Sequence, residues 1–80
     1  MTRDWCVWIP FGDESAAENA AACLQLNDLD SEHDGRTVWL YCSKVHNAKR
    51  LEKEALHILR RDGLATLIVR DPRILRWNAR

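Results

Sequence analysis

Three short apolar runs alternate with two segments of helical periodicity, and this alternation limits the fold more than any other feature. The runs span residues 5–11, 37–42 and 65–69, and their β-branched and aromatic residues favour strands. Residues 16–26 and 47–62 instead repeat apolar side chains every three or four positions, as amphipathic helices do. The order predicts an α/β domain of three strands and two helices.

Local signals indicate where these helices begin and end. Ser15 and Glu18 form a capping-box pattern at the start of the first helix. Asn47 is the expected N-cap of the second helix, with Ser43 as an earlier alternative. Gly63 follows that helix, at the position where a left-handed residue often ends one.

Eighty residues are enough for one domain, which we expect to span residues 1–80. Right-handed crossovers would make the strands parallel. Strand order 1-2-3 packs both helices on one face and is our expectation, whereas order 2-1-3 places them on opposite faces. An extra strand within the acidic connection, residues 27–35, would give an α+β, ferredoxin-like split β-α-β arrangement. The tail, residues 73–80, is either a helical turn or an edge extension of the sheet.

Strand side chains alternate between two faces, and the two predicted faces differ. One is uniformly apolar and suits the helices. The other carries Trp8, Trp39, Tyr41 and Arg70. If the helices cover only the first face, these rings form an exposed aromatic surface of the kind that marks interaction sites. The alternative is that a helix or the tail covers them.

A formal net charge of zero hides a strong polarity along the chain. Residues 1–43 hold two basic and eight acidic side chains, whereas residues 44–80 hold ten basic and four acidic ones. An acidic strip concentrates part of this charge: Asp28, Asp30, Glu32 and Asp34. We expect the strip to contact a basic partner surface by charge complementarity, unless the two halves neutralise each other after folding.

No motif for a metal, cofactor or nucleotide stands out. Residues 30–35 resemble the first half of a calcium loop, but the twelfth position is Tyr41 where a glutamate is needed. Only three glycines are present, too few for a phosphate cradle. We therefore expect no cofactor, no metal site and no enzyme activity.

Cysteine content and hydropathy indicate the compartment. Cys6, Cys23 and Cys42 are widely spaced and odd in number, which favours a reducing interior without disulfides. No apolar run approaches the roughly 18 residues of a membrane span. We expect a cytoplasmic protein without a membrane partner.

Residues 38–43 and the helix expected after them resemble the active-site strand of rhodanese domains. That resemblance would imply a thiol enzyme at Cys42. Rhodaneses follow the cysteine with a loop that carries glycine and arginine, whereas residues 43–47 contain neither. We expect a buried, unreactive Cys42 instead.

The leading expectation is therefore a small non-enzymatic module that docks on a protein or nucleoprotein as a regulator or inhibitor. Small phage-type anti-defence proteins, such as anti-CRISPRs, belong to this class. One alternative is a module that binds single-stranded nucleic acid on the aromatic sheet face. Another is a homodimer that uses this face as its own interface.

Overall fold

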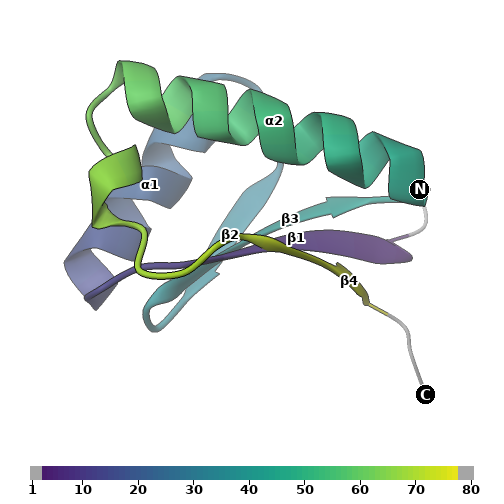
Figure 1. The fold of residues 1–80 in the computed structure, drawn as a ribbon, viewed down its shortest axis with the longest axis horizontal. Helices are drawn as coiled ribbons and strands as arrows, with labels where there is room; N and C mark the ends of the chain where they lie inside the picture. The colour runs from purple at the N-terminus through teal and green to yellow at the C-terminus, as the bar shows by residue number, and fades with distance from the viewer. Residues whose placement is uncertain (1–2, 78–80) are drawn as a thin grey trace.

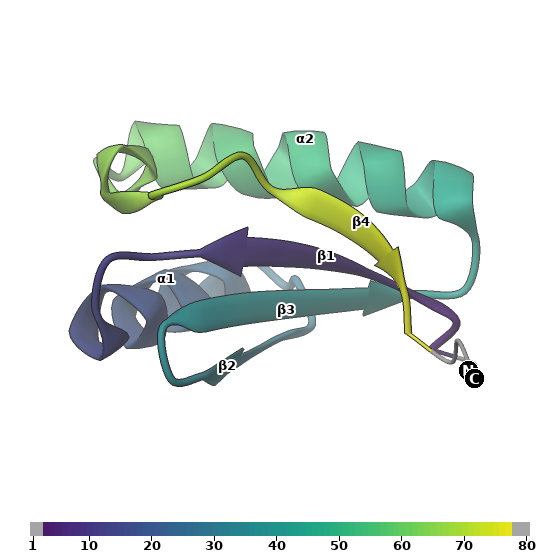
Figure 2. The same cartoon turned by 60° about the horizontal axis from the view of Figure 1, so that its bottom comes forward.

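Four strands form one antiparallel sheet, and both helices lie against the same face of it (Figures 1 and 2). The computed structural model describes residues 3–77. The elements in chain order are β1 (Trp5–Pro10), α1 (Glu14–Leu26), β2 (Ser31–Asp34), β3 (Thr37–Cys42), α2 (Val45–Arg61), the 3₁₀ turn η1 (Ala65–Leu67) and β4 (Arg73–Arg76). The sheet order is β2-β3-β1-β4.

This order is the ferredoxin-like alternative, an α+β fold built from two interleaved split β-α-β units. β3 lies between β1 and β2, and β1 lies between β3 and β4. Every neighbouring pair of strands is antiparallel, so the expected parallel pairing is wrong. The expectation that both helices pack on one face is confirmed (Figure 2).

The extra strand is β2, which lies within the acidic connection. A two-residue turn at Gly35 and Arg36 joins it to β3, and Gly35 has a φ of 59°. That positive φ suits the tight hairpin turns whose twist matches the strands. The Ser31 hydroxyl donates to the Ala21 carbonyl at 3.0 Å, and the Gln25 amide donates to the Ser31 carbonyl at 2.7 Å. These polar contacts with α1, together with the hairpin, position a strand that has little β propensity of its own.

The predicted third strand, residues 65–69, is wrong. Residues 65–67 form η1, and only Ile68 makes an isolated bridge, to Phe11. The position beside β1 belongs to β4, after Asp71 and Pro72 interrupt the chain. The edge-extension interpretation of the tail is therefore confirmed for residues 73–76, and residues 78–80 lie outside the described part.

The hydrophobic core lies between the helices and the predicted apolar face of the sheet. Val7, Ile9, Phe11, Val38 and Leu40 are at most 2% exposed. Their helix partners are Ala16, Ala17, Ala20, Ala21 and Leu24 of α1, and Ala48, Ala55, Ile58 and Leu59 of α2. The alanines allow α1 to approach the sheet closely, and each large buried side chain contributes about 1.5–3 kcal/mol through burial.

Both helices begin earlier than expected, by two residues for the predicted cap Ser15 and by three for the predicted cap Asn47. The N-cap of α1 is Asp13, because its carboxylate accepts the Ala16 amide hydrogen at 2.7 Å, and Ser15 lies inside the helix. α2 begins at Val45, between the two predicted starts, and its N-cap Lys44 makes no side-chain hydrogen bond.

Left-handed residues end both helices. Gly63 has a φ of 76°, and the Leu64 amide donates to the Leu59 carbonyl at 2.8 Å, as in a Schellman motif. Asp28 has a φ of 64° at the equivalent position of α1, where the Leu29 amide donates to the Leu24 carbonyl at 3.0 Å. Asp28 therefore has a backbone role that its place in the acidic strip did not suggest.

We expect Asp28→Gly to raise the free energy of unfolding by about 0.5–1 kcal/mol, because glycine reaches a positive φ without a Cβ clash. Urea denaturation followed by circular dichroism measures the change. Asp28→Ala is the matched control and should lower stability, because alanine lacks the tolerance of aspartate for this conformation. If Asp28→Gly lowers the free energy of unfolding as much as Asp28→Ala does, this account of the cap is contradicted.

Candidate functional site

The helices leave the second face of the sheet without a covering layer, and its side chains form rows across the strands. Residues directly opposite each other in an antiparallel sheet point to the same face. Glu32 lies opposite Trp39, Trp39 opposite Trp8, and Trp8 opposite Arg73. One row therefore crosses all four strands, with two indole rings between a carboxylate and a guanidinium.

A second row runs from Tyr41 through Cys6 to Leu75. Trp77 extends this edge of the sheet, since its amide donates to the Asp4 carbonyl at 2.9 Å. Its ring makes edge-on contacts with Trp39 and Tyr41, at centroid distances of 5.6 and 5.0 Å. We call the following set the open face: Cys6, Trp8, Thr37, Trp39, Tyr41, Leu75 and Trp77.

The rings of the open face are partly covered by one another and partly exposed to solvent. Trp8, Trp39 and Tyr41 are half-buried, whereas Trp77 is 45% and Leu75 38% exposed. Cys6, beneath them, is fully buried. The open face is thus an aromatic surface in which the Trp77 ring packs against those of Trp39 and Tyr41.

Arg3 links this aromatic surface to the acidic strip. Its guanidinium lies 4.5 Å from the centroid of the Tyr41 ring and 3.4 Å from both Asp30 and Glu32. The Tyr41 hydroxyl donates to Glu32 at 3.4 Å. Burial raises the pKa of Tyr41, and the negative charge of Glu32 raises it further, so the phenol stays protonated at neutral pH.

A hollow of about 260 Å³ opens between the acidic strip and the open face. Its lining residues are Arg3, Glu32, His33, Asp34, Trp39, Tyr41 and Trp77. The walls combine aromatic rings with charges of both signs. Such a hollow suits a side chain of a partner protein better than a uniformly charged ligand.

The predicted acidic strip is only partly one surface. Asp30, Glu32 and Asp34 follow the β2 edge and are exposed, while Asp28 belongs to the C-terminal cap of α1. An extended strand places alternate residues about 7 Å apart, so the three carboxylates do not converge as in a calcium loop. Among residues 3–77, no cluster of three or more His, Cys, Asp or Glu side chains could hold a metal ion.

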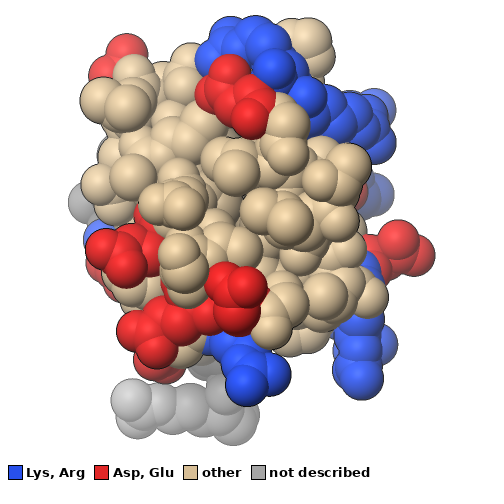
Figure 3. Space-filling model, turned by 90° about the vertical axis from the view of Figure 1, so that its left-hand side faces the viewer, with Lys and Arg blue, Asp and Glu red and all other residues tan. Residues whose placement is uncertain are grey.

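Charge is also separated in space. In the end-on view of Figure 3, the main group of carboxylates lies at the lower left and the main group of lysines and arginines at the upper right, and an uncharged area lies between them. Further basic side chains lie below the carboxylates, and one carboxylate group adjoins the upper basic group. In the sheet, the β2 edge carries Glu32 and Asp34, and the β4 edge carries Arg73 and Arg76. The polarity of the sequence thus persists in the fold as two oppositely charged sheet edges.

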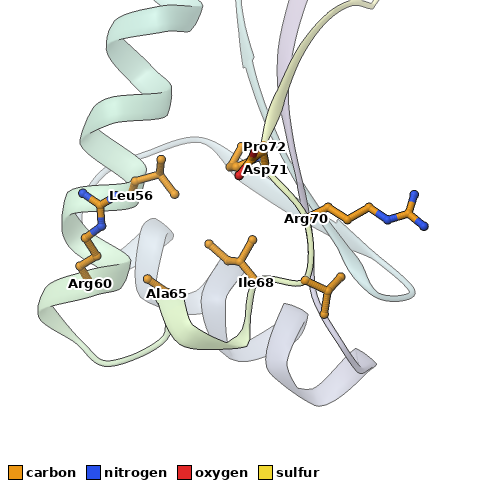
Figure 4. Close-up of a pocket in the computed structure, with 8 residues that line it drawn as sticks. Leu56, Arg60, Ala65, Ile68, Arg70, Asp71 and Pro72 are labelled. Atoms are coloured by element: carbon orange, nitrogen blue, oxygen red, sulfur yellow. The ribbon is translucent and has the colours of Figure 1, made fainter.

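Arg70 does not lie in a strand, as its predicted place in the sheet required. Arg70 lies in the connection between η1 and β4, and its side chain points away from α2 (Figure 4). The prediction failed because residues 65–69 do not form a strand. The arginine that completes the face is Arg73, opposite Trp8.

Arg3 was not among the predicted site residues, whereas Leu75 and Trp77 were expected only as part of a tail that could cover the rings. Trp77 does contact Trp39 and Tyr41. One signal was present, since Arg73, Leu75 and Trp77 alternate as side chains on one face of a strand do. Because the third strand was assigned to residues 65–69, this alternation was not interpreted as the strand beside β1. Arg3 gave no pattern, because its contacts with Asp30 and Glu32 span 27 and 29 residues.

The cysteines show no sign of thiolate activation. Burial raises the pKa of the Cys42 thiol above its ordinary value of 9.0, and burial also raises that of Cys6. Burial and a 2.8 Å hydrogen bond to Asp62 raise the pKa of Cys23 to about 11. A nucleophilic cysteine needs the opposite shift.

Comparison of the chain with protein-family models, with curated proteins and with solved structures finds no match. Neither α1 nor α2, the two α-helices of residues 3–77, is long and apolar enough to cross a membrane.

We expect iodoacetamide to modify Cys42 slowly at neutral pH, with a rate that keeps rising above pH 9. The reason is that the thiolate, whose pKa is raised, is the reacting species. Mass spectrometry of digested protein resolves each site, and fully buried Cys6 serves as an unreactive internal control. A rate at Cys42 that reaches a plateau below pH 8 would contradict this and would favour a thiol enzyme.

Proposed function

We propose that this protein is a binding module that docks on another protein through the open face and acts as its regulator or inhibitor. The observation that carries the proposal is the row of Trp8 and Trp39 between Glu32 and Arg73. Tryptophan, tyrosine and arginine are the residue types enriched in binding hot spots, which lie at the centre of interfaces with polar rims. The open face has this arrangement of aromatic centre and charged edges.

The charges around the rings favour a protein over a polyanion. Glu32 lies directly opposite Trp39, and Asp30 and Asp34 follow the same edge. These carboxylates would repel phosphates near the most central ring. A protein partner can instead present basic groups toward the β2 edge and acidic groups toward the β4 edge.

The rigid placement of the rings also favours docking. Trp39 donates its indole hydrogen to the Thr37 hydroxyl at 3.0 Å, and its ring contacts Trp77 edge-on. Rings fixed before binding lose little conformational entropy when a partner covers them. The open face is thus ready to bind without rearrangement of the sheet.

The test compares two single variants as affinity baits in an extract of the source organism. Trp8→Glu places a charge in the centre of the open face, and Leu26→Glu places one at a residue that is 86% exposed on α1. We expect wild type and the Leu26 variant to retain the same partner, and the Trp8 variant to lose it by on the order of tenfold or more.

Circular dichroism first establishes that both variants fold. Trp8→Phe, which keeps an aromatic ring, should restore most of the retained partner. Docking through the open face would be contradicted if wild type, Trp8→Glu and Leu26→Glu all retained the partner equally. Equal loss of the partner by both glutamate variants would contradict it as well.

A second candidate function is the binding of single-stranded nucleic acid. The specific observation in its favour is that aromatic rings lie on the two central strands of a four-stranded antiparallel sheet: Trp8 on β1, and Trp39 and Tyr41 on β3. RNA-binding sheets of this strand number stack bases on rings of the central strands. Here, however, Trp77 and Arg3 already contact the rings of β3.

Fluorescence titration with single-stranded oligonucleotides of mixed sequence separates the two functions. If protein docking is correct, tryptophan emission should stay unchanged even at low salt, where phosphate contacts are strongest. Quenching that weakens steeply with added salt, and that Trp8→Ala reduces, would favour the nucleic-acid function instead.

A further inference from the structure

β4 is an edge strand whose outer side has no neighbour in the sheet. The Trp77 amide bonds to Asp4 on the inner side, and the antiparallel pattern alternates from there. The main chains of Ile74 and Arg76 therefore point outward. Within residues 3–77, no other backbone segment pairs with this outer side, so it can accept an added strand.

The side chains beside this edge carry mostly positive charge. Arg70, Arg73 and Arg76 lie within seven consecutive positions, with Asp71 as the carboxylate among them. All four side chains are exposed. In the described part of the chain, none of the three arginines forms an ion pair with a carboxylate. An extended segment with acidic side chains would supply the missing counter-charges.

A hollow of about 340 Å³ lies where the chain enters β4 (Figure 4). Leu56 and Arg60 of α2 line one side of it, and Ile68 and Pro72 line the other. The lining is mixed, because Arg60, Arg70 and Asp71 are charged whereas the other five residues are apolar, and Arg60 runs along α2 beside Leu56. The hollow can receive an apolar side chain from a strand that lies along β4.

We propose that the β4 edge binds an extended acidic peptide segment of a partner protein, which adds to the sheet as a fifth strand. Main-chain bonds to Ile74 and Arg76 supply affinity, as in other cases of strand addition. Side chains of the segment on the helix side meet the hollow and Arg76, which also lies over the Trp5 ring. Alternate side chains on the other side meet Arg73. This surface is distinct from the centre of the open face, so the inference goes beyond the docking function proposed above.

The probe is a short synthetic peptide that alternates valine with glutamate, added to the ¹⁵N-labelled full-length protein. We expect the amide resonances of Ile74 and Arg76 to shift most, in a saturable titration that weakens as salt is raised. A peptide that alternates valine with lysine is the charge control, and should shift these resonances on the order of tenfold more weakly or not at all.

Two further variants test the main-chain bonds. A valine–glutamate peptide with N-methyl groups on alternate residues cannot donate main-chain hydrogen bonds from one of its two edges. We expect this peptide to lose binding to the β4 edge. On the protein, Arg76→Pro removes an outward N–H and Arg76→Ala keeps it, so the proline variant should bind at least several-fold more weakly. Equal binding by the methylated and unmethylated peptides would overturn strand addition.

The remaining outcomes also decide the question. Shifts confined to Trp8, Trp39 and Tyr41 would overturn the edge proposal and leave docking through the open face intact. A molar mass that increases with protein concentration would indicate self-association. If Glu32→Lys restores the mass of a monomer, the β4 edge instead pairs with the β2 strand of a second copy, and the peptide proposal is overturned. No shift with the acidic peptide would overturn the proposal as well.

Discussion

The insertion of β3 between β1 and β2 determines the rest of the molecule. It separates two strands that a crossover through α1 connects, and β1 likewise separates β3 from β4. The crossover through α1 leads from β1 toward one edge of the sheet, and the crossover through α2 leads from β3 toward the other edge. β1 and β3, from which they start, are antiparallel. With the same right-handed sense, both therefore place their helices on one face. Residues 3–77 form no third layer, so the second face is covered by its own side chains.

The aromatic rings are a response to that constraint. Large rings on β1 and β3 cover Cys6 and the sheet backbone, and Trp77 closes over them from the end of β4. The same rings remain partly exposed, because a single layer of side chains cannot remove them from water completely. The proposed recognition would therefore use the same residues that cover the sheet. A partner that covers the open face would complete the layer that the chain lacks.

Electrostatics add direction to this surface. Because β2 and β4 are the two edges of the sheet, the acidic and basic halves of the sequence end up on opposite sides of the rings. Arg3 is a basic residue within the acidic half, and it contacts Tyr41, Asp30 and Glu32. These exposed ion pairs contribute little to stability. Their effect is to fix the position of a guanidinium at the border between the rings and the carboxylates.

Sequence patterns predicted the parts of the fold that depend on local periodicity. The strand over residues 37–42, the two helices, the left-handed Gly63 and the apolar face that holds Ile9 and Leu40 all follow from alternation and capping. β2 was not specified in the same way, because a hairpin and contacts with α1 position its polar residues. Residues 73–76, and not the predicted residues 65–69, form the strand beside β1. Tertiary packing decides this position. With that exchange, Arg70 came to lie in a connection, and Arg73, Leu75 and Trp77 took the positions beside β1.

Hydroxyl-radical footprinting of the free protein tests most directly whether the second face of the sheet is open. Trp39, Tyr41 and Trp77 should be oxidised readily, whereas Phe11, which is 2% exposed beneath the helices, should be protected. Protection of all the open-face rings would contradict an uncovered aromatic surface. Oxidation of Phe11 at a comparable rate would contradict the placement of both helices on the opposite face.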